Sequence, residues 1–285
     1  MRIVTDSAVD LPEEMFAQFN IERMPLLISF GKETLRSGVD IGAEEFYRRL
    51  AASGDNIPTT SQPSPGEFAK LYRQVGATDR DILSIHISSG LSGTLNSAVQ
   101  GAQQCPELHI THVDTKTLSA AEGFQVVAAA QGLRRHWPLP KILERIQQVG
   151  EQTEIYFTLD TLHYLQKGGR IGRVQAMAGA LLNLKPVITV DKGPGTYITV
   201  AKGRSMAKSV ALVADQVAEK MKQIPAWVHV LHTNSPTMAQ QLADRVRAKL
   251  PNAQITFGQI VPVLGVHTGP GCVGAVCGPA DLLAE

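Results

Sequence analysis

The chain of 285 residues is long enough for about two domains, and 44% hydrophobic with 19% charged residues is typical of a globular protein. With 27 Lys and Arg against 26 Asp and Glu, the net charge is +1 and no basic block stands out, which argues against a nucleic-acid partner. No apolar run approaches the roughly 20 residues of a membrane span, and the start MRIVTDSAVD lacks the apolar segment of a signal peptide. Three cysteines do not make a disulfide framework, so we expect a cytoplasmic protein.

Strand-like apolar runs alternate with helical patterns along the chain, which predicts an α/β fold. The expected strands are Arg2–Thr5, Arg23–Phe30, Ile82–Ile87, Ile110–Asp114, Glu154–Thr158, Ile188–Asp191, Thr196–Val200, Trp227–His232 and Gln254–Ile260. The expected helices lie near Pro12–Gln18, Ala43–Ala52, Gly66–Val75, Thr94–Gln104, Ala120–Arg135, Pro140–Val149, Ser205–Met221 and Thr237–Lys249.

The pattern changes in the second half of the chain. Up to about residue 150, strands are followed by helices, which predicts a mostly parallel sheet flanked by helices. The segment Asp191–Thr196 (DKGPGT) is typical of a hairpin turn, so the second sheet should be mixed. We therefore predict an N-terminal α/β domain over residues 1–155 and a C-terminal α/β domain over residues 156–285.

A loop rich in glycine and serine, Ser88–Thr94, lies between the expected strand Ile82–Ile87 and the next helix. Backbone N–H groups at the start of a helix have no partner within it, and such a place attracts an anion. The loop has no lysine and no P-loop spacing, so its hydroxyls and amides suit a carboxylate better than a nucleotide. The alternative is a capping loop whose glycines adopt positive φ.

A second stretch, Asn56–Pro65, places prolines around three hydroxyl residues. Proline stiffens the backbone and lowers the entropy cost of holding Thr60 and Ser61 in place. The stretch is therefore either a ligand-binding segment or a rigid connector that ends in the helix cap at Ser64.

Three further polar residues each allow a structural and a functional interpretation. His267, in a loop with Gly-Pro-Gly, can hydrogen-bond an anion or serve the structure. Asp6 ends the first strand, where a turn-forming role is favoured over a general base or metal ligand. Arg170, among three glycines, suits ligand contact, docking of a charged partner or a solvated turn. The small apolar stretch Ala176–Leu182 is typical of a core helix, although it also leaves room for a slender apolar ligand.

Five motifs, in order along the chain, resemble those of a known family. They are Thr5-Asp6-Ser7 with Asp10-Leu11, Thr60-Ser61-Gln62-Pro63-Ser64, Ser88–Thr94, Gly168-Gly169-Arg170-Ile171 and His267-Thr268-Gly269-Pro270-Gly271. From residue 1 to about residue 280, the sequence resembles the DegV family of bacterial fatty-acid-binding proteins, which includes the FakB subunits of fatty acid kinase. Each motif alone is weak, but five in the same order are specific.

This resemblance implies two α/β domains with one long-chain fatty acid, such as palmitate, stearate or oleate, held between them. Its carboxylate would lie near the surface and its acyl chain in a buried apolar tunnel. Carried over by position, the ligand-binding residues are Thr60, Ser61, Ser92, Gly93, His267 and Thr268. Arg170 would lie on the rim of the site or serve partner docking.

The resemblance also implies a carrier rather than a catalyst, because a separate ATP-using kinase subunit would phosphorylate the bound fatty acid to an acyl phosphate. The chain itself has no nucleotide motif, and Cys272 and Cys277 lack a second pair of metal ligands, so we expect neither a cofactor nor a metal. The alternative function is an enzyme that acts on a small carboxylated substrate, with Asp6 or His267 as general base.

Overall fold

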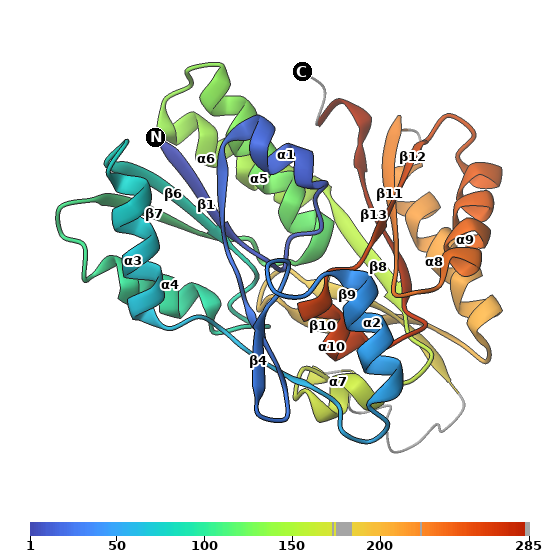
Figure 1. Cartoon of the computed structure of the whole chain (residues 1–285). Coiled ribbons are helices and arrows are strands. Elements are labelled where there is room, and N and C mark those ends of the chain that lie inside the picture. Colours follow the sequence, from blue (N-terminus) through green and yellow to red (C-terminus); the bar gives the residue numbers. More distant parts are fainter. Residues whose placement is uncertain (173, 175–183, 223, 283–285) are drawn as a thin grey trace.

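The computed structural model describes residues 1–172, 174, 184–222 and 224–282, which form a mixed α/β fold with three sheets (Figure 1). The first sheet is parallel and has the strand order β2-β1-β6-β7. Its strands are β1 (Arg2–Asp6), β2 (Ile21–Met24), β6 (Asp81–His86) and β7 (His109–Asp114).

Helices cover both faces of the parallel sheet. Neighbouring residues of its strands point to opposite sides, and both sets of side chains are apolar and buried. Val4 and Ile82 pack against α3 (Pro65–Gly76) and α4 (Thr94–Ala102) on one face. Ile3 and Leu83 pack on the other face. The helices of this second face are α1 (Glu13–Phe19), α5 (Ser119–Arg134) and α6 (Leu139–Gln152).

The second sheet is mixed, with six strands in the order β10-β9-β8-β13-β11-β12. These strands are β8 (Glu154–Thr158), β9 (Lys185–Asp191), β10 (Thr196–Gly203), β11 (Ala226–His232), β12 (Gln254–Gln259) and β13 (Val273–Pro279). The helices α8 (Met206–Met221) and α9 (Pro236–Lys249) pack on one face. The other face shares a hydrophobic core with the N-terminal half of the chain (Figure 1).

A small antiparallel sheet, β4-β3-β5, completes the junction between the two halves. It contains β3 (Leu27–Phe30), β4 (Glu33–Arg36) and β5 (Thr59–Ser61), with α2 (Ala43–Ala52) nearby. Two short helices from the second half pack there, α7 (His163–Lys167) and α10 (Pro262–Thr268), and a 3₁₀ turn follows at Ala280–Leu282. Because α10 contacts α2, β3 and β5, residues from both ends of the chain meet at one place.

The expected α/β class, with a parallel first sheet and a mixed second sheet, is confirmed. The expected strand Arg23–Phe30 is two strands of different sheets, because Pro25 has no N–H for a continuous ladder. The strands β4, β5 and β13 and the helices α7 and α10 were not predicted. His267 and Thr268 were expected in a loop, which is wrong, because both belong to α10, whose first turn carries Pro262.

Two other expectations concern the organisation of the chain. The predicted boundary between residues 155 and 156 falls inside β8, and the two-domain division stays a prediction. The stretch Ala176–Leu182 lies outside the described residues. Within the described part of the chain, no helix has the length and apolar character needed to cross a membrane.

Candidate functional site

Two adjacent cavities lie where the three sheets meet. The first, here called the polar chamber, is lined by Leu26, Thr60, Ile87, Leu91, Ser92, Leu118, Arg170, Tyr197, Val263, Leu264 and His267. The second, the apolar chamber, is lined by Leu118, Ser119, Ile155, Phe157, Tyr197, Leu231, Ile260, Leu264, Thr268, Cys272, Gly274 and Ala275. The two share Leu118, Tyr197 and Leu264 as walls, so a polar chamber lies directly beside an almost wholly apolar one.

The centre of the polar chamber is a contact between Thr60 and His267. Thr60 is the middle residue of β5, and His267 lies in the last turn of α10. The Thr60 Oγ1 and His267 Nε2 atoms are 2.8 Å apart, which is a hydrogen bond across 207 positions of sequence. The predicted ligand residues Thr60 and His267 are therefore neighbours in the structure.

The imidazole of His267 is neutral near pH 7. Burial, and to a smaller extent the positive charge of Arg170, lowers its pKa to about 4. Its Nδ1 atom is buried and has no hydrogen-bond partner among the described residues. A neutral imidazole donates one hydrogen bond and accepts another, so His267 offers a polar contact without a charge.

Arg170 is the charged residue among the described residues that line the polar chamber. Its Nη1 donates to the carbonyl oxygen of Gly168 at 2.7 Å, and its Nε donates to the carbonyl oxygen of Leu91 at 3.3 Å. These contacts leave the guanidinium partly exposed beside His267, where the rest of its donors can meet an anion.

Most hydroxyls of the Ser88–Thr94 loop serve the structure. The Ser88 hydroxyl donates to the carbonyl oxygen of Gly195 at 2.8 Å, and the Ser89 hydroxyl donates to Asp114. Ser92 lines the polar chamber and lies 2.8 Å from Thr94, oxygen to oxygen. Most of the loop therefore has the structural role that was the alternative to ligand binding, and Ser92 is its serine that lines the polar chamber.

The other three predicted ligand residues lie at different places. Gly93 is the N-cap residue of α4, next to Ser92. Thr268 lines the apolar chamber, and its hydroxyl donates to the carbonyl oxygen of Leu264 at 3.1 Å. Ser61 is exposed and does not line either chamber, because alternate residues of β5 point to opposite sides.

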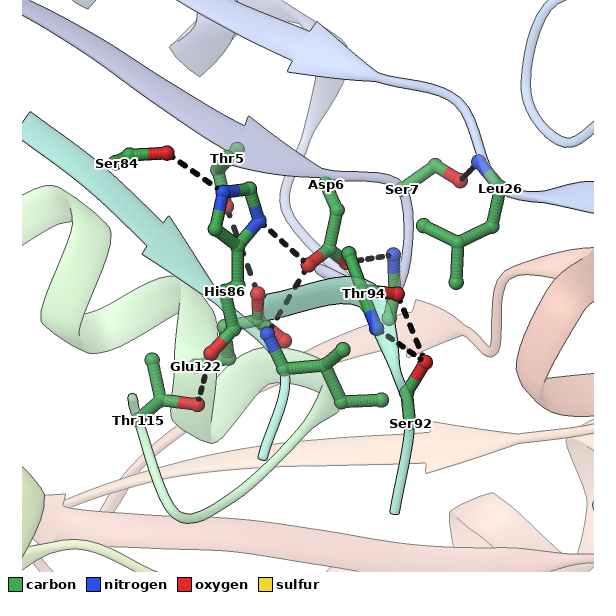
Figure 2. A network of polar contacts seen from close by, with 12 residues as sticks. Thr5, Asp6, Ser7, Leu26, Ser84, His86, Ser92, Thr94, Thr115 and Glu122 are labelled. Atoms are coloured by element: carbon green, nitrogen blue, oxygen red, sulfur yellow. Dashed lines mark hydrogen bonds and ion pairs between the residues drawn. The ribbon is translucent and has the colours of Figure 1, made fainter. Parts of the chain in front are cut away.

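Asp6 belongs to a buried network rather than to a chamber wall (Figure 2). Its carboxylate accepts hydrogen bonds from the backbone N–H groups of Ala8 at 2.9 Å and Ile87 at 3.0 Å, and it lies 3.0 Å from His86 Nδ1. His86 Nε2 lies 2.7 Å from the Ser84 hydroxyl, an order of groups that resembles a catalytic triad. Asp6, Ser84 and His86 are fully buried, so a substrate does not reach them, and Asp6 fastens the ends of β1 and β6.

Sequence reasoning missed the shared walls of the two chambers and one feature of the polar end. Leu118, Tyr197 and Leu264 come from three distant segments, and no local signal marks them. The sequence places Gly168 in the motif Gly168-Gly169-Arg170-Ile171 but predicts no role of its own for it. A Cβ atom at Gly168 would lie 2.1 Å from His267 Nδ1, so the absence of a side chain there makes room for the imidazole.

Comparisons with known proteins agree with this architecture. A family model described as "Uncharacterised protein, DegV family" matches residues 1–279. A DegV domain-containing protein of Deinococcus radiodurans is 37% identical over 281 residues, which cover 97% of this chain and 98% of that protein.

Two solved structures are similar over nearly their whole length. One, titled as fatty acid binding of a DegV family protein from Thermus thermophilus, has a TM-score of 0.89 at 31% identity and covers 98% of this chain and 100% of that one. The other, titled as a stearic-acid-binding protein from Eubacterium ventriosum, has a TM-score of 0.87 at 26% identity, with 98% of both chains covered. The family match and the similarity of the Deinococcus protein show that the chain belongs to the DegV family.

Proposed function

We propose that this protein binds one long-chain fatty acid, with the carboxylate in the polar chamber and the acyl chain in the apolar chamber. The observation that carries this proposal is that a polar and an apolar chamber lie side by side and share the walls Leu118, Tyr197 and Leu264. The relatives from Thermus thermophilus and Eubacterium ventriosum, whose titles name fatty acid and stearic acid, support the same ligand class.

The charge and polarity of the chambers suit an amphipathic monoanion. Each buried methylene group contributes about 0.8 kcal/mol, so the acyl chain supplies most of the binding free energy. At the head group, Arg170 balances one negative charge, and Thr60, Ser92 and the neutral His267 supply hydrogen bonds. A nucleotide would bring several charges to a site whose lining, among the described residues, contains one cation.

The other three predicted ligand residues belong to the same proposal, although none of them lines the polar chamber. The Gly93 amide stands at the start of α4, beside Ser92, and suits a carboxylate oxygen. Thr268 lies one residue beyond His267 and supports the apolar chamber, and Ser61 flanks Thr60 on the exposed side of β5. The walls come from both proposed domains, residues 1–155 and 156–285, so the ligand would lie between them.

We also propose that the protein presents its ligand to an ATP-using kinase subunit in the cytoplasm. Thr60, Ser92 and Arg170 are only partly buried, so the head group lies near the surface and a partner can approach it. Incubation of the palmitate-loaded protein with such a subunit and ATP should form an acyl phosphate, which hydroxylamine traps as a hydroxamate. Formation of no hydroxamate with a kinase that is active on another carrier would contradict presentation but not binding.

The binding proposal is tested by native mass spectrometry of protein purified from bacteria. The expected spectrum shows one non-covalently bound fatty acid per chain, such as palmitate, stearate or oleate. If the protein arrives empty and takes up neither palmitate nor oleate, the proposal is wrong.

The head-group assignment is tested by the double variant Thr60→Ala with Ser92→Ala. A lost hydrogen bond to a charged group costs about 1.5–3 kcal/mol, so palmitate affinity should fall more than tenfold. The matched control is Ser29→Ala with Thr34→Val, an exposed hydroxyl pair 2.9 Å apart that lines neither chamber and should leave the affinity unchanged. Equal affinities of the two double variants would refute the assignment.

A further inference from the structure

Asp10, in the first of the five motifs, lines neither chamber, yet both oxygens of its buried carboxyl group have partners. Oδ1 accepts a hydrogen bond from the backbone N–H of Val261 at 2.7 Å, and Oδ2 accepts one from the Ser119 hydroxyl. Asp10 follows β1, Ser119 begins α5 and Val261 immediately precedes α10. One side chain therefore joins three segments that are far apart in the sequence.

The segment before α10 is held by two more side chains of the N-terminal half. The Tyr47 hydroxyl donates to the carbonyl oxygen of Ile260 at 2.9 Å, and the N–H of Val263 donates to the Ser37 hydroxyl at 3.3 Å. At its other end, α10 carries His267, which contacts Thr60. The position of this seven-residue helix relative to the N-terminal half thus decides where the imidazole lies.

The partners of Asp10 also belong to the chamber walls. Ser119 lines the apolar chamber, and its φ of 63° is unfavourable for a residue with a side chain. Its N–H donates to the carbonyl oxygen of Ala8 at 3.1 Å, so the loop that carries Asp10 binds Ser119 twice. The buried groups that interact electrostatically with Asp10 are Tyr47, Cys272 and Glu122, none of which is a cation.

We propose that Asp10 is a positioning residue for the carboxylate site: by accepting hydrogen bonds from Val261 and Ser119, it fixes α10 against α5 and so holds His267 beside Thr60. This inference rests on the proposed function of the polar chamber. It gives the first motif of the chain a role at the head group without any contact between Asp10 and the ligand.

The test compares Asp10→Ala with Glu122→Gln, a control at a second buried acid. Glu122 lies in the same helix as Ser119, but its carboxylate accepts a hydrogen bond from the Thr5 hydroxyl and not from the segment before α10. Affinities for palmitate and for hexadecanol, which has the same chain and no carboxylate, are measured by displacement of a fluorescent fatty acid. Loss of Asp10 should lower the preference for palmitate over hexadecanol about tenfold, the lower end of the effect seen when a group that orients a metal ligand is removed. Glu122→Gln should leave that preference within about twofold of the unmodified protein. An unchanged preference in Asp10→Ala overturns the proposal, because general destabilisation would weaken both ligands equally.

A second variant removes the same hydrogen bond from the other side and guards against failure of Asp10→Ala to fold. Val261 has a φ of −60°, which proline adopts, so Val261→Pro replaces the N–H donor by a ring carbon beside the carboxylate and leaves Asp10 itself unchanged. The same loss of preference is expected, and an unchanged preference would overturn the proposal.

A measurement without ligand separates this inference from the proposed function. The ring ¹H and ¹⁵N resonances of His267 should shift in Asp10→Ala and in Val261→Pro, but not in Glu122→Gln. Unshifted His267 resonances overturn the positioning role, whatever the protein binds. Failure of the unmodified protein to bind palmitate, with the shifts present, refutes the proposed function and leaves the positioning of His267 supported.

Discussion

Substitution of Gly168 by alanine tests the head-group site, because it displaces His267 and leaves the imidazole itself unchanged. Gly168 lies at the C-terminal cap of α7 with φ −75° and ψ −6°, a conformation that alanine adopts without strain. A Cβ atom there would lie 2.1 Å from His267 Nδ1 and 2.8 Å from Cε1, against an ordinary contact distance of 3.4 Å or more. The imidazole must therefore move by about 1.3 Å, or the turn that carries Gly168 must shift by a similar amount.

Such a movement is large enough to break the contact with Thr60. The two atoms are 2.8 Å apart, and a displacement of 1 Å or more away from Thr60 takes them beyond hydrogen-bond distance. Loss of the His267 contact with a carboxylate costs about 1.5 kcal/mol or more, so we expect the Kd for palmitate to rise about tenfold. Overpacking also costs about 1–3 kcal/mol of stability, of which the replacement of glycine by alanine restores about 0.4–1 kcal/mol, so the melting temperature should fall by several degrees at most.

The assay is titration of delipidated protein with palmitate, followed by calorimetry or by displacement of a fluorescent fatty acid. The matched control is Gly66→Ala in α3, where the nearest heavy atom to a new Cβ is 4.0 Å away and binding should be unaffected. Equal affinities of Gly168→Ala and Gly66→Ala would refute the reasoning, because His267 would then either move freely or make no contact with the carboxylate.

The sequence predicts most of the sheets because their signals are local. Apolar runs such as Ile82–Ile87 mark buried strands, and the glycine-proline turn before Thr196 marks the antiparallel hairpin of β9 and β10. The strand β13 has no such signal, since two glycines and a cysteine dilute its apolar residues. Its place in the middle of the six-stranded sheet is decided by pairing with β8 and β11, which only tertiary structure provides.

The candidate site shows the same limit for polar residues. Composition identifies Ser88, Ser89 and Ser92 as equivalent hydroxyls, but their roles differ because their partners lie far away in the sequence. Ser88 meets Gly195 and Ser89 meets Asp114, which leaves Ser92 at the chamber. A hydroxyl-rich loop therefore indicates that one of its hydroxyl residues lines a cavity, but it does not indicate which one.

Two buried groups give opposite pH dependences of stability that test the electrostatics of the site. Burial lowers the pKa of His267 to about 4, below the ordinary 6.5, so the folded state binds fewer protons than the unfolded state and loses stability as the pH falls below 6.5. In urea unfolding, the free energy of unfolding should fall by about 2 kcal/mol between pH 7 and pH 5, and this fall should be absent in His267→Gln. If the two proteins show the same pH dependence, the imidazole is not neutral and buried. Burial raises the pKa of Asp10 from 3.8 to about 7, so between these pH values the folded state keeps a proton that the unfolded state releases. The contribution of this proton to the free energy of unfolding declines as the pH rises from about 4 to 7. The stability of the unmodified protein relative to Asp10→Asn should therefore fall by about 3 kcal/mol between pH 5 and pH 8, and a constant difference would show that the carboxyl group between Ser119 and Val261 is ionised throughout.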